Sequence, residues 1–288
     1  MAFRVNTNTD ALQAYYQLAK VNAETTKAQM RLSSGKRIMS VADDTSGFNV
    51  GTSLKGKVAV MKGAQSNISA AKNMLSTAEG GLLGINDLLT KIEGKLSDAT
   101  NPTNDRSALA NDIKALSEEI GKILSNTKFN NANLLSGSDV AAGDKFVFQV
   151  GEFGDNLDLD FAENLASAGA ASGGTNVADE LAKFTGVALG SLTDTTGVGD
   201  LNTALGKIKT EVTDSLGKIG NMVQRLDIKD ETLNTSIANA ESSISRLFDA
   251  DMAMEQLNAT RGSILQQAGT AMLAQLNIAP QQVLQLFG

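Results

Sequence analysis

The 288-residue sequence lacks cysteine, histidine and tryptophan, and it holds only two prolines. Without cysteine, the chain forms neither disulfides nor thiolate metal sites. Without histidine and cysteine, it has lost the commonest general base, the best nucleophile and the usual transition-metal ligands. Asp, Glu, Ser and Lys remain, but no cleft with a base among them is marked by the sequence. We therefore predict no enzyme, no catalytic residues, no metal and no cofactor.

The sequence also has little positive charge. Its 25 Lys and Arg face 32 Asp and Glu, which gives a formal net charge of −7. A basic face with interleaved aromatic residues is the usual sign of nucleic-acid binding, and none is evident, so we predict no nucleic-acid partner. The opening residues, MAFRVNTNTDALQAYY, contain no apolar core of a cleaved signal peptide. On this evidence the protein is cytoplasmic, or it leaves the cell without a cleaved signal.

Residues 262–288 contain no charged side chain, although 20% of the chain's residues are charged. Apolar residues recur there at steps of three and four, which predicts a helix with neutral polar edges. Three interpretations are open: a membrane span, a final helix docked on its own domain, and a helix buried against copies of itself and against the other end of the chain. The apolar runs are far shorter than the roughly 20 residues that a span needs. We therefore predict no membrane insertion and favour burial between copies.

Most of the remaining sequence predicts long helices. A first helix begins with Thr9 or Asp10 as its cap and ends at Gly35, a natural C-cap. Its predicted face is an apolar stripe diluted by polar residues: Leu12, Tyr15, Leu18, Asn22, Thr25, Gln29 and Leu32. Asp43 and Asp44 precede the next helix, where capping is a better interpretation than a metal or catalytic pair.

Two rods with apolar residues at three and four spacing follow, over residues 54–96 and 205–257. A third helix, over residues 109–123, comes after the break at 101–104. The two rods lie at opposite ends of the chain, so we predict that they pair as an antiparallel coiled coil. The second rod is predicted to run straight into the uncharged tail.

Alternating apolar residues at 145–150 and 156–161 predict a β-hairpin, and residues 178–184 a short helix. The fold class is therefore mainly α, with long antiparallel coiled-coil helices from the two chain ends and a small β-hairpin region.

Four stretches resemble bacterial flagellin. They are LSSGKRIMSVADDTSGFNVGTSLKGKV from Leu32, TAEGGLLGINDLLTKI from Thr77, TKFNNANLLSG from Thr127, and ADMAMEQLNATRGSILQQAGTAMLAQLNIAPQQVLQLFG from Ala250. The resemblance implies a structural subunit that polymerises into the flagellar filament for swimming, exported unfolded and folded on assembly. It also implies a secreted protein of the extracellular flagellum. The implied partners are further copies of the chain, an export chaperone, the filament cap protein, the hook–filament junction proteins and the flagellar type III export apparatus.

The resemblance further implies a division into domains. Residues 1–40 and 245–288 would form an inner coiled-coil domain in the filament core. Residues 41–161 and 204–244 would form an outer helical domain with the β-hairpin, and residues 162–203 a short variable surface segment.

Two sets of residues follow from the resemblance. The expected self-assembly residues are Leu12, Leu32, Ile38, Leu265, Leu273, Leu276 and Leu286. Lys91 and Asp112 occupy positions at which some flagellins contact an innate Toll-like receptor, although Lys91 lacks the planar fork of the family's arginine. Alternatives are a minor flagellin, a hook–filament junction protein, or a secreted coiled-coil translocator or adhesin.

Overall fold

The computed structural model describes residues 8–101, 103–135, 146–152, 154–159, 177–186 and 195–287. The chain forms two compact units. The terminal unit consists of Met1–Val58 and Ala238–Gly288, and the central unit consists of Ala59–Ile237. Each is described by itself below.

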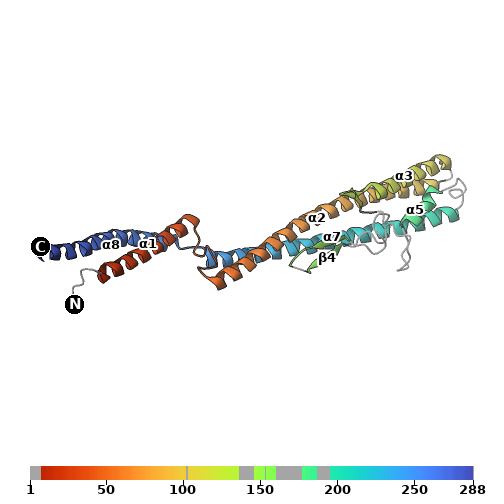
Figure 1. The fold of residues 1–288 in the computed structure, drawn as a ribbon. Coiled ribbons are helices and arrows are strands. Elements are labelled where there is room, and N and C mark those ends of the chain that lie inside the picture. Colours follow the sequence, from red (N-terminus) through yellow and green to blue (C-terminus); the bar gives the residue numbers. More distant parts are fainter. Residues whose placement is uncertain are drawn as a thin grey trace. The chain divides into compact units, whose positions relative to one another are not determined.

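In the terminal unit, α1 (Thr9–Ser34) and α8 (Met252–Phe287) lie side by side (Figure 1). The cap of α1 is Asn8, one residue before the predicted start, and its side chain accepts a hydrogen bond of 3.0 Å from the Ala11 N–H. The helix ends at Gly35, as predicted. Gly35 adopts a φ of 69°, a left-handed conformation that favours glycine.

The predicted continuous rod into the tail is wrong, because α7 (Thr195–Phe248) ends before α8 begins. Asp251 caps α8, accepting from the N–H groups of Ala253 (3.0 Å) and Met254 (3.2 Å). The residues between the two helices pair through the main chain with those that follow α1. The Arg37 N–H donates to the Phe248 carbonyl (2.6 Å), and the Ala250 N–H donates to the Gly35 carbonyl (2.9 Å).

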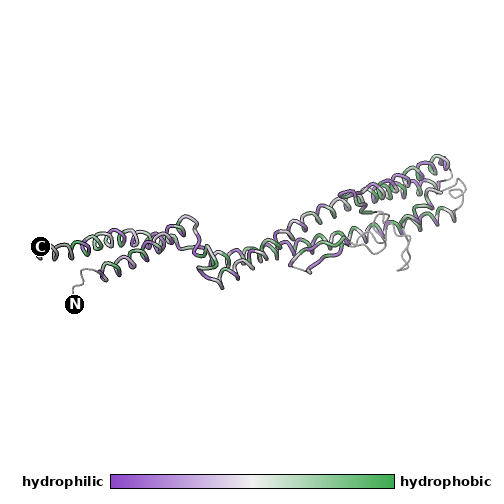
Figure 2. The backbone as a smooth tube through the Cα atoms, in the orientation of Figure 1, coloured by the Kyte–Doolittle hydropathy of each residue, from purple (hydrophilic) through white to green (hydrophobic). Residues whose placement is uncertain are grey.

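In the central unit, α2 (Thr45–Ala99) and α7 run antiparallel, as predicted. The predicted α2 seam from Val58 to Leu96 is buried except at Gln65, which is half-buried. Hydrophobic and hydrophilic residues alternate along both helices (Figure 2), so an apolar side of each can face the core. Side-chain pairs connect the helices, among them Gln65 with Asn234 (2.8 Å), Lys72 with Asp227 (2.7 Å) and Glu93 with Lys209 (2.6 Å).

The other central elements are α3 (Arg106–Asn126), α5 (Val177–Thr185) and two hairpins. The strands β3 (Phe146–Gln149) and β4 (Asn156–Leu159) pair antiparallel, which confirms the predicted hairpin. Likewise, α5 confirms the predicted short helix.

A second hairpin, β1 (Lys128–Phe129) with β2 (Ala132–Asn133), was not predicted. Its turn residues, Asn130 and Asn131, have φ values of 48° and 69°. Asparagine tolerates this conformation better than most residues, so the Asn-Asn pair was the available signal.

Neighbouring glycines of α2 provide a matched test of this packing. A Cβ at Gly81 would lie 2.8 Å from the Thr127 Oγ1 and 2.9 Å from the Leu135 Cδ1, whereas a Cβ at Gly80 meets no described atom within 4 Å. We expect Gly81→Ala to destabilise the central unit by about 1–3 kcal/mol through overpacking. Gly80→Ala should stabilise it by roughly 0.5–1 kcal/mol, because alanine favours the helix. Chemical denaturation measures the free energy of unfolding of both variants. Equal changes in the two variants would contradict the packing described.

Candidate assembly surface

The side of α1 that faces α8 is lined mostly by small residues. Buried and half-buried positions recur on α1 at alternating steps of three and four, the spacing of a coiled-coil seam. Only three of the seven residues at these positions are leucine or valine: Ala11, Ala14, Leu18, Val21, Thr25, Ala28 and Leu32. The predicted face was therefore partly wrong, since Leu12 and Tyr15 point away from α8 and are exposed.

The matching side of α8 holds two glycines that let the helices approach closely. A Cβ at Gly262 would overlap the Thr25 side chain, and a Cβ at Gly269 would lie 2.9 Å from the Leu18 Cδ1. The covered positions again follow the coiled-coil spacing: Glu255, Ala259, Gly262, Gln266, Gly269, Leu273 and Leu276. We call these positions, with the seven of α1, the inner seam.

Polar contacts fix the register of the pair at both ends. The Arg31 guanidinium donates to the Glu255 carboxylate at 3.0 Å, and the Asn8 side-chain amide donates to the Leu276 carbonyl at 3.0 Å. Glu255 is largely buried, with 10% of its side chain exposed. Sequence reasoning missed this ion pair; its signal was a charged residue at a seam position of an otherwise apolar pattern.

The sides of α1 and α8 that do not face each other carry bulky apolar residues, which we together call the outer face. Examples are Tyr16 with 64%, Ile264 with 61% and Leu257 with 60% of the residue exposed. Met254 and Leu257, which lie within the predicted rod of residues 205–257, belong to this face. Its full set is Leu12, Tyr15, Tyr16 and Met30 of α1, and Met252, Met254, Leu257, Ile264, Leu265, Met272 and Ile278 of α8. Bulky apolar side chains exposed in this number on one helix pair indicate an interaction site.

The expected self-assembly residues fall into different environments. Leu12 and Leu265 are exposed on the outer face, whereas Leu32, Leu273 and Leu276 are half-buried in the inner seam. Ile38 is buried, and the side chain of Leu286 lies outside the described ones. The role of these residues in assembly stays a prediction.

The expected receptor residues lie in the central unit. Lys91 of α2 and Asp112 of α3 are both exposed. Asp112 forms an ion pair of 2.7 Å with Lys95 of α2. Receptor recognition stays a hypothesis.

The two aspartates after α1 serve local structure. Asp43 forms an ion pair of 2.6 Å with Lys27 and accepts from the N–H groups of Met39 and Ser40. The hydrogen bond from Lys27, with those from the main chain, holds the pKa of the Asp43 carboxyl well below its usual range. Asp44 caps α2, accepting from the Gly47 N–H at 2.8 Å. In the described part of the chain, no three metal-ligating side chains gather as a cation site.

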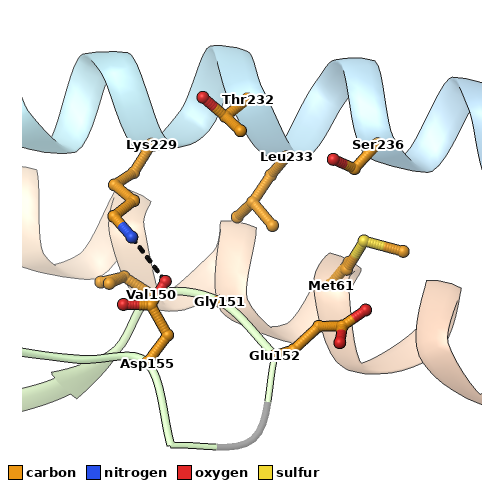
Figure 3. Close-up of a pocket in the computed structure, with 9 residues that line it drawn as sticks. All are labelled: Met61, Val150, Gly151, Glu152, Asp155, Lys229, Thr232, Leu233 and Ser236. Atoms are coloured by element: carbon orange, nitrogen blue, oxygen red, sulfur yellow. Dashed lines mark hydrogen bonds and ion pairs between the residues drawn. The ribbon is translucent and has the colours of Figure 1, made fainter.

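A pocket of about 300 Å³ lies between α2, α7 and the loop of the β3–β4 hairpin (Figure 3). Met61 and Leu233 supply apolar side chains, and Lys229 pairs with Asp155 at 2.5 Å across one side. The ion pair ties the hairpin loop to α7. Among the described residues that line the pocket, the ion pair engages the lysine and one of the two carboxylates.

A buried carboxylate holds α5 against α7. Glu180, with 5% of its side chain exposed, accepts from Lys183 at 2.6 Å and from Lys207 of α7 at 3.1 Å. Burial by itself would raise the pKa of Glu180, but the hydrogen bonds from the two lysines outweigh it and lower the pKa below its ordinary value of 4.5.

Acid is therefore expected to loosen α5. A lowered folded-state pKa contributes stability that is present above the ordinary value of 4.5 and is lost as the pH falls through the folded-state value. At neutral pH, Glu180→Gln should reduce hydrogen-exchange protection of α5 by about 1–2 kcal/mol. At about pH 3, below the ordinary carboxyl pKa, the variant and the parent should differ less in the hydrogen-exchange protection of α5. A difference that is constant with pH would disprove this role of Glu180.

Both ends of the chain match models of one protein family. The bacterial flagellin N-terminal helical region matches residues 5–139, and the C-terminal helical region matches residues 203–287. A flagellin of Halalkalibacterium halodurans is 30% identical over 286 residues, covering 98% of this chain and 98% of that protein. The chain belongs to the bacterial flagellin family. The family predicted from the four sequence stretches is thereby confirmed, and with it the structural role of a filament subunit.

Other flagellins match along the same length. The flagellin of Bacillus subtilis is 31% identical over 308 residues, covering 98% of this chain and 99% of that protein. The flagellar filament 33 kDa core protein of Treponema phagedenis is 29% identical over 300 residues, with 98% and 99% covered. No helix in the described part of this flagellin is both long and apolar enough to cross a membrane.

A solved structure shares the flagellin's fold. It is a Vibrio parahaemolyticus protein assigned as flagellar hook-associated, with a TM-score of 0.58 and 20% identity. The match covers 72% of this chain and 100% of that one. At this identity the likeness concerns the fold alone.

Proposed function

We propose that the outer face of the α1–α8 pair is the surface that becomes buried between copies of this chain when the flagellar filament forms. The observation that carries the proposal is the reversed distribution of side chains. Six of the fourteen inner-seam positions are alanine or glycine, whereas isoleucine, methionine and tyrosine are found outside the seam, together with Leu12, Leu257 and Leu265. A helix pair that were complete in the free subunit would place its bulky residues inside.

The energetics favour assembly as the step that stabilises the chain ends. Full burial of one leucine or isoleucine side chain contributes about 1.5–3 kcal/mol. The outer face offers four such residues on α8 alone: Leu257, Ile264, Leu265 and Ile278. Their burial opposes the entropy lost when the subunit is fixed in a polymer.

The proposed domain division follows the same logic. Residues 1–40 and 245–288 form the inner domain of the filament core, residues 41–161 and 204–244 the outer domain, and residues 162–203 a variable surface segment. Supporting this, the terminal unit includes both inner stretches, and every outer-face residue lies within them.

The exposed outer face also supports the finer proposals about partners. An export chaperone covers α8 before assembly, because an uncovered apolar helix face promotes aggregation. The flagellar type III apparatus exports the chain, the cap protein places it at the filament tip, and the hook–filament junction proteins hold the filament base. The protein then acts outside the cell, as a building block without enzymatic activity.

A hook–filament junction protein is the second candidate. The fold shared with the hook-associated protein of Vibrio parahaemolyticus favours it. The end-to-end match with several flagellins favours the filament subunit instead. Filaments grown from the purified chain alone would distinguish the two.

Two isoleucines of nearly equal exposure provide the test. Ile264 on the outer face is 61% exposed, and Ile228 of the central unit is 64% exposed. Because both face solvent in the free subunit, neither Ile264→Asp nor Ile228→Asp should unfold it. We expect Ile264→Asp to raise the critical concentration for seeded polymerisation at least about tenfold, since a carboxylate would be buried unpaired. Ile228→Asp should change it little. Unaltered polymerisation of Ile264→Asp would refute the proposed surface.

A further inference from the structure

The methionines of the chain divide cleanly between the two units. The sequence has nine methionines, of which eight lie in the described residues. Five are exposed, between 36% and 57%, and all belong to the terminal unit: Met30, Met39, Met252, Met254 and Met272. Three are at most 8% exposed, and all belong to the central unit: Met61, Met74 and Met222.

Four of the exposed methionines belong to the outer face. Met252 and Met254 lie on the first turn of α8, and Met30 lies on the last turn but one of α1. The Arg31–Glu255 ion pair joins these two helix ends. Met272 lies farther along α8. The fifth, Met39, is in the segment after α1, where its sulfur accepts a 3.3 Å hydrogen bond from the Ser34 hydroxyl.

We propose that these five methionines are sites of reversible oxidation by a peroxide, and that their oxidation keeps the free subunit from assembling. The inference rests on the proposed burial of the outer face. Exposed thioethers react readily, whereas those packed in the central unit are shielded by their neighbours. Four of the five accessible methionines therefore lie on the proposed assembly surface.

The reaction is a two-electron oxygen transfer. The methionine sulfur attacks one oxygen of hydrogen peroxide, the O–O bond breaks, and the sulfur keeps that oxygen as a sulfoxide. The other oxygen leaves as water after taking up the proton. The sulfur is oxidised and the peroxide is reduced. In the reverse direction, two thiols reduce the sulfoxide to the thioether and leave as a disulfide and water, a reaction catalysed by methionine sulfoxide reductases.

Oxidation changes what the outer face can bury. A sulfoxide is polar, and its burial between apolar helices without a hydrogen-bond donor is unfavourable. Oxidised subunits should thus be rejected from the growing end. In a finished filament the same sulfurs are covered by neighbouring copies and are protected. Peroxide would therefore stop growth without dissolving existing filaments.

The experiment treats the full-length subunit with dilute hydrogen peroxide, locates sulfoxides by peptide mass spectrometry and measures seeded polymerisation. We expect oxidation at the five exposed methionines, sparing of Met61, Met74 and Met222, and a critical concentration at least about tenfold higher. Both stereospecific sulfoxide reductases with dithiothreitol should restore polymerisation. Preformed filaments should be oxidised at least about tenfold more slowly, because their sulfurs are covered.

Methionine-to-leucine variants test whether oxidation of the exposed methionines is what blocks polymerisation. Leucine matches methionine in volume and resists oxidation. A variant with all five exposed methionines changed to leucine should polymerise equally with and without peroxide. A control with Met61→Leu, Met74→Leu and Met222→Leu should stay sensitive. Normal polymerisation of the oxidised parent, or sensitivity of the five-leucine variant, would overturn the proposal. Failure of the untreated parent to polymerise would instead overturn the proposed assembly surface, and this inference with it.

Discussion

A chain that ends at Ser263 is expected to form no filaments at all. The deletion of residues 264–288 removes Ile264 and Leu265 from the outer face and Gly269, Leu273 and Leu276 from the inner seam. The N-terminal part of α1, where Leu18 lies against Gly269 and Asn8 donates to the Leu276 carbonyl, then loses its partner, and an unpartnered helix segment of this length is marginal in water. Negative-stain microscopy after addition of filament seeds and a precipitating salt tests this, with the full chain as the positive control.

The central unit should survive the same deletion, since the deleted residues are outside it. Its melting temperature, followed by circular dichroism, should change by less than a few degrees. Loss of polymerisation together with an unchanged melting transition would show that the deletion prevents assembly without unfolding the central unit. Regular filaments from the shortened chain would disprove the role assigned to the tail.

In the Glu255→Leu variant, the free energy that holds α1 against α8 is expected to fall by about 2 kcal/mol. The variant leaves the Arg31 charge without its partner while only 23% of that side chain is exposed. The Arg31 Nε already has no hydrogen-bond partner among the described residues. Breaking a fully buried pair costs about 3–5 kcal/mol, and the partial exposure of Arg31 reduces this. Hydrogen exchange of α1 amides, measured in the free subunit, reports the change.

Two further variants test whether the unpaired Arg31 charge causes the loss of stability in Glu255→Leu. The double variant Arg31→Met with Glu255→Leu should recover much of the loss, because no charge then remains buried. As a matched control, Glu119→Leu breaks the exposed Lys122–Glu119 pair of α3 and should cost less than about 1 kcal/mol. A double variant as unstable as Glu255→Leu alone would show that lost packing, rather than the unpaired charge, dominates.

The central unit was largely predictable because the apolar periodicity of its helices matches the residues that are buried. Ile68, Leu75, Leu82 and Leu89 of α2 are spaced at seven residues and are fully buried. There, bulky apolar side chains fill a core within one subunit, so periodicity and burial coincide. The β3–β4 hairpin and α5 were predicted for the same reason.

The terminal unit was harder, because its helices have two sides that avoid water for different reasons. Periodicity predicted one face of α1 with Leu12 and Tyr15 on it, but Ala11 and Ala14 are the residues at the α1–α8 contact. The glycines at 262 and 269 bring the helices so close that small residues fit best. Sequence alone cannot separate a contact within the subunit from one between subunits, since both are apolar.

Two local features escaped prediction for lack of a strong signal. The interruption between α7 and α8 contains no glycine or proline, and Asp251 as a cap was its main sign. The β1–β2 hairpin depends on two asparagines with positive φ rather than on a pattern of strands. The candidate receptor residues, Lys91 and Asp112, came from resemblance alone, and no physical pattern in the sequence marked them.

The main-chain pairing beside Gly35 bears on how the protein can evolve. Its hydrogen bonds, from Arg37 to Phe248 and from Ala250 to Gly35, use peptide groups that every residue except proline supplies in full. Substitutions at positions 36 and 250 should therefore be nearly neutral, whereas Gly35, with its φ of 69°, resists replacement. The side chains beside these main-chain hydrogen bonds can thus change widely during evolution while the backbone geometry stays the same.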